Sequence, residues 1–333
     1  MKCPSCDGED LEVAIPANII RQEIYLRERF VLNRIAEKVT FAELKDRMDF
    51  VHNSNVDILP CTRCHVLLRK MDEGNFKKRY EEDSYDDHVM EYFLKIYIET
   101  FREKESFYRV LLPKGANVLE IGSYVGGFLH VAREWGWRAT GLDIGRDISR
   151  FTNAKGYTTY AQPLEECYFP NKSFDGVFIW NCFEQIIEPH ASLEKIKSIL
   201  KPNGVLVIRI PNGLFYRLCE IILEVRRNSS SQLDDGDLII KALGYNGLLG
   251  FPYQYGYSSP SLSNLVQQYG FQLIGMLNST HITLPLPKTS EWAIEEKQKI
   301  LGMLQNLAQS FSKIYPDSLA GPWMEISYRK ISV

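Results

Sequence analysis

Alternating strands and helices between residues 117 and 212 constrain the fold of this chain more than any other feature. A short apolar run at 117–121 leads into a glycine turn, and residues with helical spacing follow. This order recurs up to residue 212, and a closing strand follows at 322–333. The pattern predicts an α/β, Rossmann-like, doubly wound sheet that is mostly parallel, is covered by helices on both faces and has an antiparallel last strand.

Glycine and polar residues fall at the carboxyl ends of the predicted strands, where ligands of such sheets bind. The glycine turn at 122–127 follows the first strand, Asp143 ends the second, and Asn181 follows the fourth. Glycines let a ligand approach the backbone, because no Cβ intervenes. A carboxylate such as that of Asp143 can accept both hydroxyl hydrogen bonds of a ribose. Nicotinamide dinucleotides and S-adenosylmethionine both carry that ribose, so these residues leave both cofactors open.

Three details separate the two cofactors. The glycine pattern, which begins at Glu120, is E-x-G-x-x-x-G-G rather than G-x-G-x-x-G. Gln162 and Leu164 follow the third strand and are placed to meet the edge and the face of an adenine. Residues 174–212 continue as strand, loop, helix and strand without interruption. Together these details favour S-adenosylmethionine.

The region from about 117 to 212 resembles class I S-adenosylmethionine-dependent methyltransferases. The family's first motif is similar to VLEIGSYVGGFL, its ribose motif to GLDIG and its fourth-strand motif to IWNCFEQIIEP. A zinc-ribbon leader precedes this domain in one bacterial subgroup, and it resembles PCTRCHVLLRKMDEGNFKKRYEEDSY. That subgroup includes enzymes that act on sugars and natural-product intermediates. The resemblance therefore implies a methyltransferase with a small-molecule acceptor.

The resemblance also implies which residues form the cofactor site. They come from the glycine turn and from the ends of the following strands: Glu120, Gly122, Ser123, Tyr124, Gly126, Gly127, Asp143, Ile144, Gln162, Leu164 and Asn181. Two positions depart from the family's pattern. Tyr124 stands where the middle glycine is usual, and Gln185 stands where a histidine is frequent. The first departure bears on the shape of the turn, and the second bears on the identity of any base.

Two Cys-x-x-Cys pairs, Cys3/Cys6 and Cys61/Cys64, supply four thiolates at spacings that suit tetrahedral zinc. A complete set of four cysteines leaves no open position, so we expect a structural zinc ion and no ligand role for His65. The alternative is two unrelated reduced pairs. Without a secretion signal, disulfides are the less favoured reading.

The expected domains follow from these patterns. Residues 1–78 form a zinc-ribbon module with a helical insertion, and residues 79–112 form a helical linker. Within that linker, residues 89–111 are predicted to form one long amphipathic helix. Residues 113–333 form the methyltransferase domain, with an insertion around 214–260 whose tyrosines could make a lid or substrate loop.

Composition limits the classes of molecule that this chain is expected to bind. A net charge of −3 gives no general attraction to nucleic acid or to anionic membranes. No apolar run approaches the roughly 18 residues that span a bilayer, and the first residues have no signal-peptide core. We therefore expect a cytoplasmic protein whose partner is a small molecule rather than nucleic acid or membrane. The oligomeric state is left undetermined.

Methyl transfer depends mainly on alignment of the methyl group with its acceptor, and a base is needed only when the acceptor loses a proton. The candidates for such a base or for a substrate contact are His190, Glu184 and Tyr85, with Tyr80 and His281 as further options. A lone histidine is more often a surface or capping residue. Glu184 could equally be a hydrogen-bond partner within its loop.

The leading hypothesis is methyl transfer to an oxygen or carbon of a sugar or secondary metabolite. Three alternatives stay open. The zinc ribbon could recognise nucleic acid or protein while the Rossmann-like domain only holds a cofactor. The chain could methylate RNA, although no strong basic stripe supports this. It could also bind a nicotinamide cofactor.

Overall fold

The computed structural model describes residues 2–11, 15–36, 56–69, 86–229, 233–251, 253–280 and 289–331. The chain forms two compact units, which are described separately. The first, here the cysteine unit, comprises Met1–Met71, Pro211–Leu262 and Leu277–Met324. The second, the sheet unit, comprises Asp72–Ile210, Ser263–Met276 and Glu325–Val333. The domain boundaries expected from the sequence, after residues 78 and 112, cut the chain into consecutive segments, whereas each compact unit combines three separate segments. The expected domain boundaries stay a prediction.

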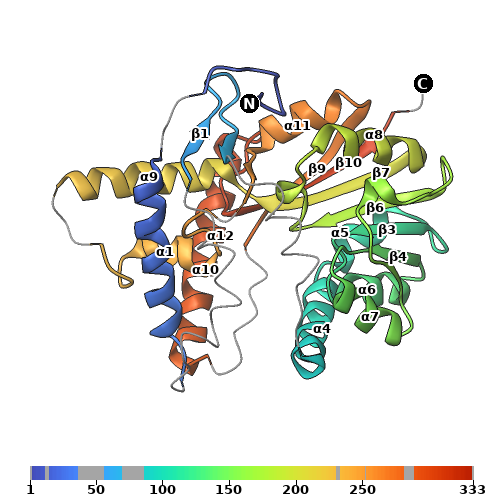
Figure 1. Ribbon diagram of the computed structural model, residues 1–333, viewed down its shortest axis with the longest axis horizontal. Coiled ribbons are helices and arrows are strands. Elements are labelled where there is room, and N and C mark those ends of the chain that lie inside the picture. The colour runs from blue at the N-terminus through green and yellow to red at the C-terminus, as the bar shows by residue number, and fades with distance from the viewer. Residues whose placement is uncertain are drawn as a thin grey trace. The chain divides into compact units, whose positions relative to one another are not determined.

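A seven-stranded sheet dominates the sheet unit, and its strands follow the order β5-β4-β3-β6-β7-β10-β9. The strands are β3 (Asn117–Ile121), β4 (Arg138–Leu142), β5 (Thr158–Tyr160), β6 (Phe174–Trp180), β7 (Leu200–Pro211), β9 (Phe271–Ser279) and β10 (Trp323–Lys330). Strands β3 to β7 pair in parallel. Figure 1 shows β3, β6 and β7 next to one another. The predicted doubly wound α/β sheet is confirmed.

Strand β3 lies between β4 and β6, so three strand ends meet at one edge of the sheet. Ile121 is opposite Leu142 of β4 and opposite Ile179 of β6. The residues that follow these three positions are therefore neighbours in space. This register brings the glycine turn, Asp143 and Asn181 to one place, as the sequence predicts.

The last strand runs against its neighbours, as predicted. The amide of Asn212, just after β7, donates to Pro322 O, and Arg329 Nη1 donates to Asn203 O at the other end of β7. Later residues of β7 are therefore opposite earlier residues of β10, so the two strands are antiparallel. The amide of Ile331 donates to Gly270 O, which gives β10 and β9 the same antiparallel sense.

Helices of the sheet unit cover this sheet. They are α4 (Asp87–Arg102), α5 (Glu105–Tyr108), α6 (Gly127–Glu134), α7 (Arg146–Ala154) and α8 (Pro189–Ile199), with 3₁₀ turns η1 (Arg109–Leu111), η2 (Leu164–Glu166) and η3 (Phe183–Gln185). Helix α11 (Ser259–Gln267) begins in the cysteine unit and ends in the sheet unit. The ring of Phe101 on α4 lies 5.4 Å from Phe128 of α6 and 5.2 Å from Trp180 of β6, centroid to centroid. These aromatic contacts attach α4 to the sheet unit.

The single long helix predicted over 89–111 is wrong. Helix α4 ends at Arg102, and α5 starts afresh at Glu105. Lys104 leaves the helical region with φ −92° and ψ 0°. Beyond the break, the Lys104 amine and the Tyr108 hydroxyl both bind the Glu325 carboxylate of β10. Contacts distant in sequence decide where this helix stops, and the apolar periodicity does not report them.

In its described residues, the cysteine unit has a small antiparallel sheet and four helices. The strands are β1 (Ile58–Pro60), β2 (Leu67–Arg69) and β8 (Tyr255–Gly256), in the order β1-β2-β8. The helices are α1 (Ala17–Leu32), α9 (Gly213–Asn228), α10 (Leu238–Tyr245) and α12 (Glu291–Ile314). Helix α10 contacts α1, α9 and α12 (Figure 1). Apolar side chains from these helices form a continuous buried cluster.

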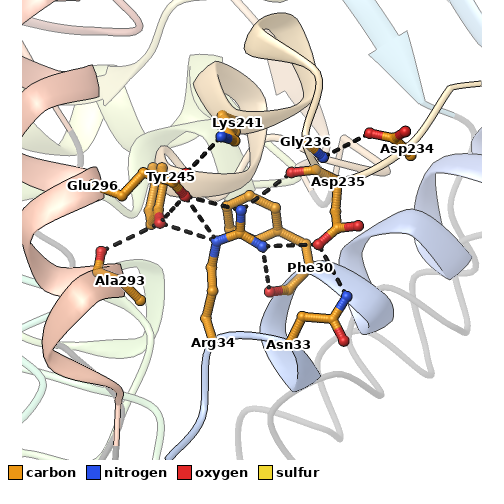
Figure 2. A network of polar contacts seen from close by, with 10 residues as sticks. All are labelled: Phe30, Asn33, Arg34, Asp234, Asp235, Gly236, Lys241, Tyr245, Ala293 and Glu296. Atoms are coloured by element: carbon orange, nitrogen blue, oxygen red, sulfur yellow. Dashed lines mark hydrogen bonds and ion pairs between the residues drawn. The ribbon is translucent and has the colours of Figure 1, made fainter.

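A buried arginine joins three of these helices (Figure 2). Arg34, just after α1, has a side chain that is 7% exposed. Its Nη1 lies 3.1 Å from Asp235 Oδ2, and its Nη2 lies 2.9 Å from Glu296 Oε2 on α12. Its Nε donates to the Tyr245 hydroxyl of α10 at 2.9 Å, and the guanidinium lies 3.7 Å from the centroid of the Phe30 ring. One cation therefore connects α1, α10 and α12.

Tyrosines that could have formed an exposed lid are buried in this unit. Tyr245, Tyr253 and Tyr257 belong to the core. The Tyr253 ring lies 5.9 Å from that of Trp323, whose indole N–H donates to Asn246 O at 3.0 Å. A lid role for the 214–260 segment stays a prediction, and these side chains would have to leave the core to contact an acceptor.

Within the described residues, no helix has the length and apolar character needed to cross a membrane. The expected cytoplasmic location stays a prediction.

Candidate functional site

A cavity of about 580 Å³ lies in the sheet unit at the carboxyl ends of β3, β4 and β6. Ten of the eleven residues predicted for a cofactor site line it: Glu120, Gly122, Ser123, Tyr124, Gly127, Asp143, Ile144, Gln162, Leu164 and Asn181. Gly126 is the eleventh and lies behind the turn, where an added Cβ would be 3.1 Å from the Tyr157 ring. The register of the parallel strands explains this convergence.

The turn between β3 and α6 needs glycine for two different reasons. Gly122 has φ +73°, and a Cβ there would lie 2.8 Å from the Cβ of Cys182. Gly127 opens α6 where α4 crosses closely, and a Cβ there would lie 2.4 Å from the Cβ of Tyr97. The turn is therefore shaped by its neighbours as well as by its own backbone.

Tyr124 occupies the turn in a left-handed conformation, with φ +43°. Its amide donates to Asp143 Oδ2 at 2.8 Å, and its ring lies 5.8 Å from that of Tyr97. A non-glycine residue at positive φ is strained unless its surroundings hold it. The carboxylate and the aromatic contact supply that support, so the tyrosine side chain becomes part of the cavity wall.

Asp143 is oriented by two backbone amides. Its Oδ2 accepts from Tyr124 N, and its Oδ1 accepts from Gly145 N at 2.9 Å. Each carboxylate oxygen has a second lone pair, so a pair of ligand hydroxyls can still bind. The side chain thus supports the glycine turn and lines the cavity at once.

Glu120 is almost completely buried, and its Oε2 has no hydrogen-bond partner among the described residues. Burial raises the pKa of this carboxyl well above its usual value, and the negative charge of Asp143 raises it further. A buried carboxyl without a cation nearby keeps its proton. A positively charged ligand group in the cavity would favour the ionised form.

Several cavity residues carry no sequence signal. Tyr97 and Phe101 come from α4, which precedes the glycine turn, and Trp180 and Cys182 come from the end of β6 and the loop after it. Burial raises the pKa of the Cys182 thiol, so it remains a neutral side chain. Only tertiary packing brings α4 over the strand ends.

Two of the predicted catalytic candidates, His190 and Glu184, belong to the described residues. Neither His190 nor Glu184 is among the described residues that line the cavity. His190 Nδ1 is 2.5 Å from the Tyr269 hydroxyl. Glu184 is fully buried, both its oxygens lack partners among the described residues, and burial raises its pKa to about 8. Tyr85, Tyr80 and His281 fall outside the described residues.

A second candidate site lies in the cysteine unit. The sulfur atoms of Cys3, Cys6, Cys61 and Cys64 all lie within 4.8 Å of one another. All four cysteines are free thiols. Four thiolates gathered in this way match the donor set of a tetrahedral structural zinc site.

The two cysteine pairs form matching turns. The amide of Asp7 donates to Cys3 O at 2.9 Å, and the amide of His65 donates to Cys61 O at 2.9 Å. Asp7 and His65 follow the second cysteine of each pair, and both have positive φ, at 55° and 59°. The two turns therefore place equivalent residues in the same left-handed conformation, and the absence of a ligand role for His65 stays a prediction.

The chain is similar to several known methyltransferases. The C-methyltransferase NovU of Streptomyces niveus is 29% identical over 108 residues, which are 31% of this chain and 26% of that protein. The chain thus matches about a quarter of the length of this relative. A methyltransferase from Mesorhizobium loti is 14% identical, with a TM-score of 0.45 over 68% of this chain and 97% of its own. Phosphoethanolamine N-methyltransferase 2 of Haemonchus contortus is 16% identical, with a TM-score of 0.47 over 77% and 60%.

The family assignment rests on a domain match, because both TM-scores are below 0.5. The family described as "Methyltransferase domain" matches residues 88–275, which are more than half of the chain. The matched range includes β3 to β7 and every described residue that lines the cavity. The chain therefore belongs to the methyltransferase-domain family.

Proposed function

We propose that this protein transfers a methyl group from S-adenosylmethionine to a small-molecule acceptor. The observation that carries the proposal is the single cavity that gathers Glu120, Asp143, Gln162 and Asn181 at the strand ends of a methyltransferase domain. Asp143 would hold the ribose hydroxyls, and Gln162 and Leu164 would border the adenine. Glu120 would face the ammonium group of the methionine moiety.

The acceptor is proposed to be a sugar or a secondary-metabolite intermediate, methylated on oxygen or carbon. The resemblance of the cysteine-rich leader to those of enzymes with such substrates supports this. The similarity to NovU, a C-methyltransferase, favours carbon. Because only a limited part of that relative is matched, this preference is a proposal for the present chain.

Alignment within the cavity would supply most of the rate acceleration, since methyl transfer is a direct displacement. Neither of the two described base candidates lines the cavity: the Glu184 side chain is fully buried, and His190 is engaged by Tyr269. We therefore assign the base role to neither of them. A base of this kind is required only for an acceptor that must lose a proton.

Replacing Asp143 with alanine should weaken S-adenosylmethionine binding by about 1–3 kcal/mol. The change removes a ribose ligand and also releases the amides of Tyr124 and Gly145. Isothermal titration calorimetry measures the effect. Asp147→Ala is the matched control, because Asp147 lies on α7 with a half-exposed side chain. Equal affinities for the wild type and Asp143→Ala would remove Asp143 from the site.

The same calorimetric titration decides between cofactors. The wild-type protein should release or absorb heat with S-adenosylmethionine and show no saturable binding of NAD. Binding of NAD alone would overturn the proposed function.

Cofactor binding should release a proton from Glu120 at pH values between its pKa in the complex and its raised pKa in the free protein. Its pKa is raised in the free protein, and an adjacent ammonium group would lower it. Affinity should therefore rise with pH across the interval between the two pKa values. Titrations in two buffers with different ionisation enthalpies would reveal the released proton as a difference in observed heat. Glu120→Gln should abolish that difference, and buffer-independent heat in the wild type would contradict the assignment.

We also propose that the four clustered cysteines hold one structural zinc ion. The proximity of their sulfur atoms and the matching backbone turns support this. All four ligands come from the protein, so the ion would stabilise the cysteine unit rather than take part in methyl transfer.

A further inference from the structure

Arg209 of β7 holds Asn181 in two ways. The Asn181 amide donates to Arg209 O at 2.8 Å, and Arg209 Nη1 donates to Asn181 Oδ1. Asn181 has φ +56°, a left-handed conformation that asparagine tolerates better than most residues. Its side chain lines the cavity, whereas Arg209 is completely buried behind it.

This contact fixes the orientation of the Asn181 amide. The oxygen and the nitrogen of an asparagine side-chain amide have nearly the same shape, so they are told apart by their hydrogen-bond partners. A guanidinium has donors and no acceptor, so it can bind only the oxygen. The Nδ2 group, for which no partner is found among the described residues, is then the end of this amide that remains for a ligand in the cavity that Asn181 lines. The cavity wall presents an N–H donor at this point.

The buried groups behind Asn181 carry excess positive charge. Arg209 Nε lies 3.2 Å from Glu325 Oε1, and the Lys104 amine and the Tyr108 hydroxyl bind the same carboxylate. Two cations therefore share one anion. The positive charge of Arg209 lowers the pKa of Glu184, but burial raises it more, to about 8. The Glu184 carboxyl is therefore mostly neutral at pH 7 and does not balance the second cation. Positive potential behind an N–H donor favours an anionic oxygen as its ligand.

The place of this donor at the sheet edge indicates which group of the proposed cofactor it would contact. Asn181 follows β6, the neighbour of β3, and neighbouring strands lie about 4.8 Å apart. Glu120, near the end of β3, would take an ammonium group. Asp143 follows β4, which neighbours β3 on the side opposite β6, and it would take the ribose. An α-amino acid carries its ammonium and carboxylate on one carbon, so both could bind across the β3–β6 edge.

Resting on the proposed function, we infer that Asn181 Nδ2 binds the α-carboxylate of the cofactor's methionine moiety, with Arg209 and Glu325 as the positioning residues that fix the amide. Asn181 is then a binding residue for the amino-acid end. Arg209 acts through Asn181 and does not touch the ligand.

Two available ligands test this inference. S-Adenosylhomocysteine contains the amino-acid end, and 5′-methylthioadenosine shares the nucleoside and the thioether without it. Asn181→Asp keeps an oxygen toward Arg209 but replaces the donor with a carboxylate oxygen. Calorimetry should show S-adenosylhomocysteine affinity falling roughly 10- to 100-fold. The affinity for 5′-methylthioadenosine should change by less than about threefold. Asp143→Ala, by contrast, should weaken both ligands.

The double variant Arg209→Gln/Glu325→Gln tests the positioning role and removes both charges of the Arg209–Glu325 pair, leaving Lys104, whose side chain is 18% exposed, as the remaining cation. Its preference for S-adenosylhomocysteine over 5′-methylthioadenosine should fall, whereas a merely structural role would weaken both ligands alike. If Asn181→Asp weakens both ligands equally, or neither, the inference is overturned and the proposed function stands. If neither ligand binds the wild type, the proposed function fails and the inference fails with it.

Discussion

Replacing Cys61 and Cys64 with serine is expected to remove about one zinc ion per chain and to destabilise the cysteine unit. Both residues belong to the cluster whose sulfurs lie within 4.8 Å of one another. A ligand that binds only the folded state stabilises it by about 4 kcal/mol when its free concentration is a thousand times its Kd. Elemental analysis measures the metal, and urea unfolding measures the free energy of unfolding.

Cys167→Ala is the matched control, because Cys167 is a buried cysteine outside the cluster. It should retain the full metal content. A strong chelator should reproduce the effect of the serine double variant on the wild type and have little effect on that variant. Wild-type protein that is fully folded and metal-free after purification would contradict the zinc assignment.

Replacing Arg34 with alanine should lower the free energy of unfolding by about 2–4 kcal/mol, somewhat below the usual loss for a fully buried pair. The change leaves Asp235 and Glu296 without their shared cation (Figure 2). Both carboxylates are about one-fifth exposed, which limits the loss. Lysine at this position should restore only part of the stability, because it lacks the planar fork of arginine. Urea unfolding monitored by circular dichroism gives the values.

Arg29→Ala is the matched control for this experiment. Arg29 lies on the exposed side of α1, where a substitution typically changes stability by less than about 0.5 kcal/mol. An Arg34→Ala protein as stable as the Arg29→Ala protein would show that the cation does not hold α1, α10 and α12 together.

The sequence alone determined the parallel sheet, the strand-end site and the clustered cysteines. Apolar strands alternating with amphipathic helices leave few arrangements that bury both faces of a sheet. The ends of parallel strands necessarily share one edge, so residues after β3, β4 and β6 had to meet. The cysteine spacings likewise predicted a cluster that the structure forms. These features depend on local pattern and on general rules of chain topology.

Only the tertiary structure decided which other residues complete the site. The glycine turn was predictable from NVLEIGSYVGGFL, but the approach of Tyr97 to Gly127 was not. Periodicity also extended α4 too far, because the contacts of Lys104 and Tyr108 with Glu325 involve residues more than 200 positions away.

The same limit applies to Arg34 and to the Asn181–Arg209 pair. Arg34 reads as one of several charges on an amphipathic helix, yet it is buried against α10 and α12. Arg209 lies in an apolar strand, where its role depends on Asn181, which follows β6, and on Glu325 of β10. Local sequence fixes which faces are apolar and where turns occur. Hydrogen bonds and ion pairs between distant segments form only when the whole chain packs, and they decide what the cavity can bind.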